Sequence, residues 1–444
     1  MGRYFGTDGI RGEANKTLTV HTAFKIGHFL GHHFKSDQKG KIVIGKDTRI
    51  SSSMLEHALV AGICSGGSDA YLMHVGPTPA IAYLVRTHDF DCGVMISASH
   101  NPYYDNGIKI FDHSGTKISD HLEVKLESFI DDEFYLPLAS DTMIGESIDF
   151  QQGLDDYLNW MEQLFDFNLK GYKVVIDAAN GSATTTAKRL FEKMGADVIS
   201  MYDSPNGVNI NNHCGSTHPE SLQKAVLKHA SHFGFAFDGD ADRLIAVDEL
   251  GQLVDGDKIM YACGVHLNRK KQLKKNTVVA TVMSNLGLFK ALNQMSISVV
   301  QTQVGDKYVY QQMIQDDYTL GGEQSGHIIF KDLATTGDGL LTAMKLIEVV
   351  VTQNQSLSEI VKPCQAFPQV LKNLPVKDKK SVLDNSDIND LISVINEELN
   401  DSGRILVRPS GTESLIRVMV EADEVDKCHY FVDQVIDMIV MKGL

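Results

Sequence analysis

A short apolar run at 93–96 ends in the polar segment Ser97-Ala98-Ser99-His100-Asn101-Pro102. The run predicts a buried strand, so the polar segment would be a loop at its carboxyl end, where open α/β sheets bind their ligands. A phosphorylated serine stores a phosphoryl group and needs cations around it. Lys109 could supply that charge or carry a proton. Ser99 is therefore a candidate phosphate carrier, and Ser97 is the rival nucleophile in the same loop. The alternative is that these residues only cap an ordinary turn.

Three aspartates alternate in Asp238-Gly239-Asp240-Ala241-Asp242-Arg243, directly after another apolar run. In an extended chain they would share one face, and a small distortion would let all three carboxylates meet one hard cation. Phosphoryl transfer uses such a cation, usually Mg²⁺, to neutralise the moving oxygens. An EF-hand also begins Asp-x-Asp-x-Asp, but Arg243 stands where that loop requires glycine and the flanks predict strands. An acidic turn without a metal is the other alternative.

Two further loops carry groups suited to a sugar phosphate. Glu323 and Ser325, in the segment 322–326, offer acceptors and donors to sugar hydroxyls. The segment Arg408-Pro409-Ser410-Gly411-Thr412 offers a guanidinium, two hydroxyls and backbone N–H groups, with Arg417 nearby, which together suit a phosphate dianion. A routine glycine turn and a polar hairpin are the alternatives. The four loops together favour phosphoryl transfer on a sugar.

Composition narrows the class of protein. The 444 residues carry a formal net charge of −16, which argues against nucleic acid as a partner. The six cysteines are scattered without a Cys-x-x-Cys pair, as is typical of reduced thiols in the cytoplasm. No signal peptide is expected at the first residues, and no apolar run is long enough to predict a membrane span. The sequence predicts a cytoplasmic protein that binds a small molecule, not a membrane.

Alternating strand and helix patterns predict an α/β fold. We expect three successive α/β domains with mixed, mainly parallel sheets over residues 1–150, 151–253 and 254–366. From about residue 367 the pattern changes to a smaller α+β domain, 367–444. Within the first domain, the serines 51–53 are expected to cap a helix that follows the strand at 41–45.

The four loops, in this order and over essentially the whole chain, resemble those of the α-D-phosphohexomutases. Within that family, four segments are most similar to the branch that acts on glucosamine phosphates: Phe5-Gly6-Thr7-Asp8-Gly9, Ile96 to Pro102, Cys214-Gly215-Ser216-Thr217-His218-Pro219-Glu220 and Gly322 to His327. The resemblance implies four domains around a central cleft, each contributing one loop. It also implies a small-molecule sugar phosphate as substrate, and it is compatible with a homodimer.

The resemblance assigns roles to individual residues. It places the phosphoserine at Ser99 rather than Ser97, with Mg²⁺ among Asp238, Asp240, Asp242 and a phosphoserine oxygen. It implies that Glu323 and Ser325 face the sugar, and that the phosphate that is not reacting is held by Arg408, Ser410, Gly411 and Thr412. Arg243 and Arg417 are further candidate substrate-binding residues. Arg11, His100 and Lys109 fall where the family has its acid, base or charge-stabilising groups, and the motifs leave open which does which.

The activity that the resemblance implies is interconversion of glucosamine 6-phosphate and glucosamine 1-phosphate through a hexosamine 1,6-bisphosphate. A phosphomannomutase or phosphoglucomutase and a catalytically silent sugar-phosphate-binding protein are the alternatives. One departure from the pattern concerns the metal loop, because Ala241 stands where this branch commonly has glycine. The loop must therefore avoid a positive φ at this position or accept strain.

Overall fold

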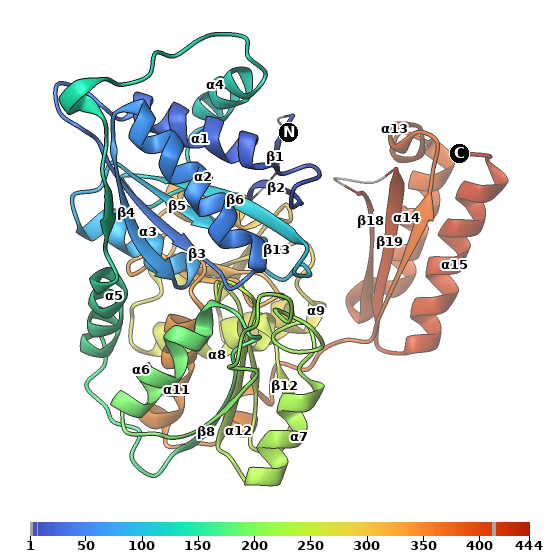
Figure 1. The fold of residues 1–444 in the computed structure, drawn as a ribbon. Coiled ribbons are helices and arrows are strands. Elements are labelled where there is room, and N and C mark those ends of the chain that lie inside the picture. The colour runs from blue at the N-terminus through green and yellow to red at the C-terminus, as the bar shows by residue number, and fades with distance from the viewer. Residues whose placement is uncertain (1–2, 7, 411–413) are drawn as a thin grey trace. The chain divides into compact units, whose positions relative to one another are not determined.

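The structure is a computed structural model that describes residues 3–6, 8–410 and 414–444. The chain forms two compact units, one of Met1–Met283 with Ser296–Lys362 and one of Ser284–Met295 with Pro363–Leu444. Figure 1 shows the elements of both units, which are described separately below. In the described part of the chain, no helix combines the length and the apolar character that a membrane crossing requires.

The first unit begins with a seven-stranded sheet in the order β1-β2-β6-β5-β3-β4-β7. Neighbours among β5, β3, β4 and β7 pair in parallel, whereas β5–β6, β6–β2 and β2–β1 are antiparallel. The strands are β1 (Phe5–Gly6), β2 (Gly9–Glu13), β3 (Lys41–Lys46), β4 (Asp69–Val75), β5 (Cys92–Ile96), β6 (Asp105–Asp112) and β7 (Ser147–Asp149). The helices that accompany this sheet are α1 (Val20–His33), α2 (Ile50–Gly66), α3 (Thr78–Thr87) and α4 (Asp120–Ile130), with a short 3-10 turn at Asp141–Met143.

Helix α2 begins differently from the prediction. Its N-cap is Arg49, whose side chain makes no capping hydrogen bond, and Ser51 and Ser52 lie inside the first turn. Their hydroxyls accept hydrogen bonds from the Asn106 side chain, and the Ser52 hydroxyl also donates to Asp47. The predicted serine cap was therefore wrong, because tertiary partners on β6 and at the end of β3 engage these hydroxyls.

Two smaller sheets complete the first unit, in the orders β12-β11-β10-β8-β9 and β14-β13-β15-β16. The strands of the first are β8 (Lys173–Asp177), β9 (Asp197–Met201), β10 (Phe233–Phe237), β11 (Leu244–Val247) and β12 (Leu253–Val254). Those of the second are β13 (Thr277–Thr281), β14 (Ser298–Thr302), β15 (Leu320–Gly322) and β16 (Ile328–Phe330). The remaining helices of this unit are α5 (Gln152–Gln163), α6 (Ala187–Lys193), α7 (Glu220–His229), α8 (Gly256–Arg269), α10 (Asp306–Gln315), α11 (Gly339–Gln353) and α12 (Leu357–Val361), with 3-10 turns at Ser182–Thr185 and Lys274–Asn276.

Three of the four candidate loops follow strands of these sheets. The Ser99 loop follows β5 and the aspartate loop follows β10, and every residue of both strands is buried. The aspartate loop leads into β11, which pairs antiparallel with β10, so the helices that flank an EF-hand loop are not found here. The loop at 323–327 joins the antiparallel pair β15 and β16. Buried strands thus carry the polar groups to loops at their ends.

The second unit is a three-stranded antiparallel sheet in the order β17-β19-β18, accompanied by helices. Its elements are α9 (Leu286–Gln294), β17 (Gln369–Pro375), α13 (Lys379–Leu383), α14 (Ser386–Leu399), β18 (Gly403–Pro409), β19 (Leu415–Ala422) and α15 (Val425–Met441), with a 3-10 turn at Asn400–Ser402. Helix α9 joins this unit although it lies between β13 and β14 in the sequence. The predicted fold class, α/β with mixed sheets and a smaller C-terminal α+β part, is confirmed, while the four domain boundaries stay a prediction.

Candidate active site

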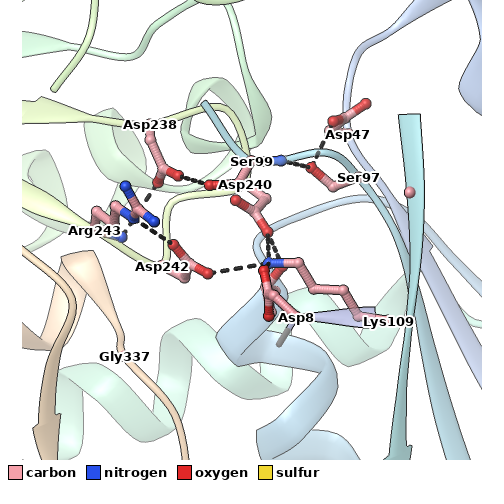
Figure 2. Close-up of polar contacts among 12 residues, drawn as sticks. Asp8, Asp47, Ser97, Ser99, Lys109, Asp238, Asp240, Asp242, Arg243 and Gly337 are labelled. Carbon is pink, nitrogen blue, oxygen red and sulfur yellow. Dashed lines mark hydrogen bonds and ion pairs between the residues drawn. The ribbon is translucent and has the colours of Figure 1, made fainter. Parts of the chain in front are cut away.

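Ser99 is buried at the turn that follows β5, with 1% of its surface exposed. Its hydroxyl donates a hydrogen bond of 2.5 Å to Oδ2 of Asp238 (Figure 2). Its φ is +52°, in the left-handed region that non-glycine residues seldom occupy. Such backbone strain is concentrated at functional sites, where the surroundings fix it. The turn thus aims a hydroxyl at a carboxylate cluster.

The three aspartates of the loop after β10 form that cluster. Each offers an oxygen within 4.8 Å of the others, and all three side chains are buried. Among the residues that the structure describes, Oδ1 of Asp240 has no hydrogen-bond partner, and Oδ1 of Asp242 has only the longer ion-pair contacts of His327 at 3.7 Å and Arg243 at 3.9 Å. Buried carboxylate oxygens without donors are costly unless a cation meets them. The donor set is oxygen only, which suits a hard divalent ion such as Mg²⁺.

The titration of the cluster reflects this concentration of charge. Burial and the neighbouring carboxylates Asp242 and Asp240 raise the pKa of Asp238 well above its usual range. Asp242 is buried as well, but Lys109 and His327 outweigh burial and hold its pKa well below the usual range. Like charges at such short range disfavour full ionisation, and a bound cation would relieve that.

Lys109, on β6, reaches into the same cluster. Its ammonium lies 2.8 Å from Asp240, 3.1 Å from Asp242 and 2.9 Å from Asp8, and its side chain is 1% exposed (Figure 2). Burial acts to lower the pKa of Lys109, but the carboxylates, led by Asp240, outweigh it and raise the pKa well above the ordinary value. Of the two roles open to Lys109, the geometry favours a permanent positive charge over a proton carrier.

The aspartate loop is also tied to the first sheet. At the start of α3, the Thr78 N–H donates to the Asp240 carbonyl at 2.9 Å, and the Thr78 hydroxyl donates to Oδ2 of Asp240. Ala241, next along the loop, is fully buried with φ at +55°. The loop therefore accepts strain at the position where glycine was expected, and the tertiary contacts of its neighbours hold it there.

His100 lies beside the Ser99 hydroxyl, and Arg11 is close enough to His100 to act on its charge. His100 Nδ1 is 3.3 Å from the Ser99 hydroxyl. Burial, with Arg243 and Arg11 nearby, lowers the pKa of His100 to about 4. The imidazole is therefore neutral at physiological pH. Arg11 donates a hydrogen bond of 2.6 Å to Asp8, which also contacts Lys109.

The sugar-loop candidates lie at the hairpin between β15 and β16. The Glu323 carboxylate accepts a hydrogen bond of 3.0 Å from the Gly305 N–H, and Ser325 is exposed. The Leu244 N–H donates to the Gly326 carbonyl at 3.0 Å, which joins this hairpin to the strand after the aspartate loop. Arg243, at the end of the aspartate loop, donates its backbone N–H to Asp238 at 3.2 Å. The structure thus brings the aspartate loop and the hairpin at 323–327 together.

The phosphate-loop candidates belong to the second unit. Arg408 on β18 and Arg417 on β19 are directly paired across the strands. Burial and the neighbouring Arg417 lower the pKa of Arg408. Like charges in opposed positions disfavour the sheet, so their presence favours an anion-binding role. Ser410 is buried, its carbonyl accepts from Lys379 at 2.8 Å, and Gly411 and Thr412 lie outside the described residues.

Four family models match the chain in order. They are the phosphoglucomutase/phosphomannomutase α/β/α domain I at 2–136, domain II at 155–251, domain III at 255–367 and the C-terminal domain at 371–438. A protein of Lachnoclostridium phytofermentans called phosphoglucosamine mutase is 50% identical over 444 residues, which is 100% of this chain and 99% of that protein. The chain belongs to the phosphoglucomutase/phosphomannomutase family. A Bacillus cytotoxicus phosphoglucosamine mutase is 48% identical over 99% of this chain and 98% of the relative.

Solved structures of the family share the fold. A phosphoglucomutase/phosphomannomutase family protein of Burkholderia thailandensis has a TM-score of 0.80 at 23% identity, covering 98% of this chain and 96% of that one. The Aspergillus fumigatus N-acetylphosphoglucosamine mutase, solved with GlcNAc-6P and magnesium, has a TM-score of 0.70 at 17% identity, covering 98% and 95%. As a phosphohexomutase, the chain is an isomerase that transfers a phosphoryl group within its substrate.

Several residues in these clusters were missed by the sequence analysis. Asp8 belongs to a glycine-rich N-terminal segment that carries no phosphate-binding fingerprint, and only the fold brings it to Lys109. Thr78 follows β4, so a search of every strand's carboxyl end would have found it. His327 lies 3.7 Å from Asp242, and Lys379 lies 31 residues before its partner Ser410.

Proposed function

We propose that the protein interconverts glucosamine 6-phosphate and glucosamine 1-phosphate, with phosphorylated Ser99 as the phosphoryl carrier and Mg²⁺ at the three aspartates. The observation that carries the proposal is the buried Ser99 hydroxyl, 2.5 Å from a carboxylate of a cluster with unsatisfied oxygens. Full-length relatives at about half identity are called phosphoglucosamine mutase, which supports the amino sugar as substrate.

Phosphoryl transfer proceeds in two balanced steps. The P–O bond to phosphorylated Ser99 breaks as a bond forms to O1 of glucosamine 6-phosphate, which gives the 1,6-bisphosphate. The O1 proton passes to a base, and the Ser99 oxygen takes up a proton once its bond to phosphorus is broken. The His100 ring, 3.3 Å from the Ser99 oxygen, is suited to relay that second proton. The bisphosphate then reverses its orientation in the site. The bond between phosphorus and O6 breaks as a bond forms to the Ser99 oxygen, the Ser99 proton is released and O6 takes up a proton, which leaves glucosamine 1-phosphate.

Asp238, Asp240 and Asp242 would hold the Mg²⁺ ion, which supplies charge neutralisation at the phosphoryl oxygens when bound. Lys109 keeps a fixed positive charge beside these carboxylates, and Arg11 remains oriented by Asp8. We assign Arg243, Glu323 and Ser325 to the sugar. We assign the phosphate that is not reacting to five residues of the second unit: Arg408, Ser410, Gly411, Thr412 and Arg417.

The proposed carrier is tested with Ser99→Ala and a matched Ser97→Ala variant. Each purified protein is primed with a hexose 1,6-bisphosphate and Mg²⁺, then tested for incorporation of a phosphoryl group by intact mass and for mutase rate. We expect Ser99→Ala to take up no phosphoryl group and to lose nearly all turnover, while Ser97→Ala remains phosphorylated. Substantial turnover by Ser99→Ala, or loss of the phosphoryl group only in Ser97→Ala, would overturn the assignment.

The substrate is tested by comparing kcat/KM for glucosamine 6-phosphate with the values for mannose and glucose phosphates. A preference of tenfold or more for the amino sugar requires only about 1.4 kcal/mol of transition-state discrimination. A preference for a neutral sugar would favour a phosphomannomutase or phosphoglucomutase. No turnover with any primed substrate would favour a silent binding protein. We also propose a cytoplasmic location and a homodimer, the latter to be tested by sedimentation.

A further inference from the structure

Two side chains donate hydrogen bonds to backbone carbonyls of the Ser99 turn. Arg49 Nη2 donates to the Ser99 carbonyl at 2.8 Å and to the Asn101 carbonyl at 2.9 Å. Asn211 Nδ2 donates to the same two carbonyls, at 2.8 and 3.1 Å. Arg49 lies between β3 and α2, whereas Asn211 comes from the long segment between β9 and α7. Two distant parts of the chain therefore converge on one pair of carbonyls.

Arg49 is itself fixed in place by Asp47. The side chains of both residues are 0% exposed, and Arg49 Nε lies 2.8 Å from Oδ2 of Asp47. The same Asp47 oxygen accepts the Ser97 hydroxyl at 2.7 Å, and the Ser97 oxygen accepts the Ser99 N–H at 3.0 Å. Asp47 thus reaches Ser99 by two routes, through Arg49 to its carbonyl and through Ser97 to its N–H.

The arrangement needs a guanidinium rather than any cation. Arg49 uses Nε for Asp47, Nη2 for two carbonyls and Nη1 for a third, that of Pro102, at 2.5 Å. A planar fork can direct donors along several lines at once, whereas an ammonium on a flexible stem is a point charge. The left-handed φ of Ser99, +52°, is a conformation that the surroundings must impose.

We propose that Arg49 and Asn211 are positioning residues for phosphoryl transfer, which lock the Ser99 turn so that its hydroxyl points at the aspartate cluster. The proposal rests on the proposed function, because it concerns the geometry of the same carrier. Neither side chain contacts the Ser99 hydroxyl; both act through its backbone. A small displacement of a reacting atom has a large effect on rate. Loss of the contacts that Arg49 and Asn211 make should therefore change kcat more than KM.

The test uses Arg49→Lys and Asn211→Gly. Lysine keeps the charge beside Asp47 and removes the fork, and glycine removes the amide while keeping the positive φ of Asn211, +56°, accessible. The matched control is Glu56→Gln, which breaks the neighbouring buried ion pair of Glu56 with Lys46. Each variant is primed, checked for folding by thermal unfolding, and measured for kcat, KM and the ³¹P resonance of phosphorylated Ser99.

We expect kcat to fall about tenfold or more in both variants while KM changes by less than about threefold, since the displaced atom is the reacting one. The ³¹P resonance should shift or broaden in both variants and stay unchanged in Glu56→Gln. Should Arg49→Lys fail to fold, Asn211→Gly decides, because it leaves the Asp47–Arg49 pair intact. Folded variants with kcat within twofold of wild type and an unchanged resonance would overturn the positioning role of Arg49 and Asn211. An inactive wild type that takes up no phosphoryl group would instead overturn the proposed function, and with it the positioning role of Arg49 and Asn211.

Discussion

Thr78 offers a direct way to test what orients Asp240, a proposed Mg²⁺ ligand. The Thr78 hydroxyl donates to Oδ2 of Asp240, and its N–H donates to the Asp240 carbonyl at 2.9 Å. Thr78→Val removes only the first bond, because valine has nearly the same shape and retains the N–H. The loop should therefore keep its place while the Asp240 carboxylate loses one of its restraints. Lys109, at 2.8 Å from the same oxygen, remains as the other.

The magnitude follows from the strength of that bond. A hydrogen bond to a charged group contributes about 1.5–3 kcal/mol, and losing a partner that orients a metal ligand typically costs about 10–100-fold in metal affinity. That range equals about 1.4–2.7 kcal/mol, so the two figures agree. We therefore expect the Mg²⁺ concentration for half-maximal mutase rate to rise about 10–100-fold in Thr78→Val, with a near-normal rate at saturating Mg²⁺.

The assay is a Mg²⁺ titration of the primed enzyme, with calorimetric binding of Mg²⁺ as a second measurement. Thr342→Val is the matched control, because the buried Thr342 hydroxyl has no hydrogen-bond partner among the described residues. Its removal should leave the Mg²⁺ dependence unchanged. An unchanged or tighter Mg²⁺ dependence in Thr78→Val would refute the view that this hydroxyl orients Asp240.

Two further predictions concern polar contacts away from the aspartate cluster. Tyr157→Phe removes the hydroxyl that donates to the Asp338 carboxylate at 2.9 and 3.0 Å. It should lower the free energy of unfolding, measured by urea titration, by about 1.5–3 kcal/mol. A loss below about 0.5 kcal/mol would contradict this. Burial acts to raise the pKa of Glu348, but its contacts with His266, Lys270 and Lys345, in that order of effect, outweigh burial and lower the pKa from 4.5. The stabilisation by Glu348 should thus be present above pH 4.5 and be lost as the pH falls further, so the stability gap between wild type and Glu348→Gln should shrink on acidification. A gap that stays constant from pH 7 to about pH 3 would refute that linkage.

Part of the fold and of the site could be predicted because it depends on local patterns. Apolar runs that end in polar turns identified β5 and β10, and with them the Ser99 and aspartate loops. The alternation of Asp238, Asp240 and Asp242 indicated their convergence, and the structure places their oxygens within 4.8 Å. Such features need only the period of a strand and the chemistry of a turn.

The rest depends on contacts between distant segments. Thr78 is 162 residues from Asp240, and Asn211 is 112 residues from Ser99, so no local pattern joins them. Ser51 and Ser52 looked like helix caps for the same reason, since their partner Asn106 lies more than 50 residues away. The strain at Ala241 was left open by the sequence because the preference of alanine alone opposes a positive φ. Tertiary contacts overrode local propensity at each of these places.

In the proposed mechanism, Ser99 carries the phosphoryl group between the two ends of the sugar. A single turnover of enzyme carrying ³²P on Ser99, mixed with unlabelled glucosamine 6-phosphate and Mg²⁺, follows that group through the reaction. We expect the label to leave the protein and to appear in hexosamine 1,6-bisphosphate and glucosamine 1-phosphate, and we expect chelation of Mg²⁺ to stop this transfer. Label that stays on the protein, or that passes only to inorganic phosphate, would contradict the proposed mechanism.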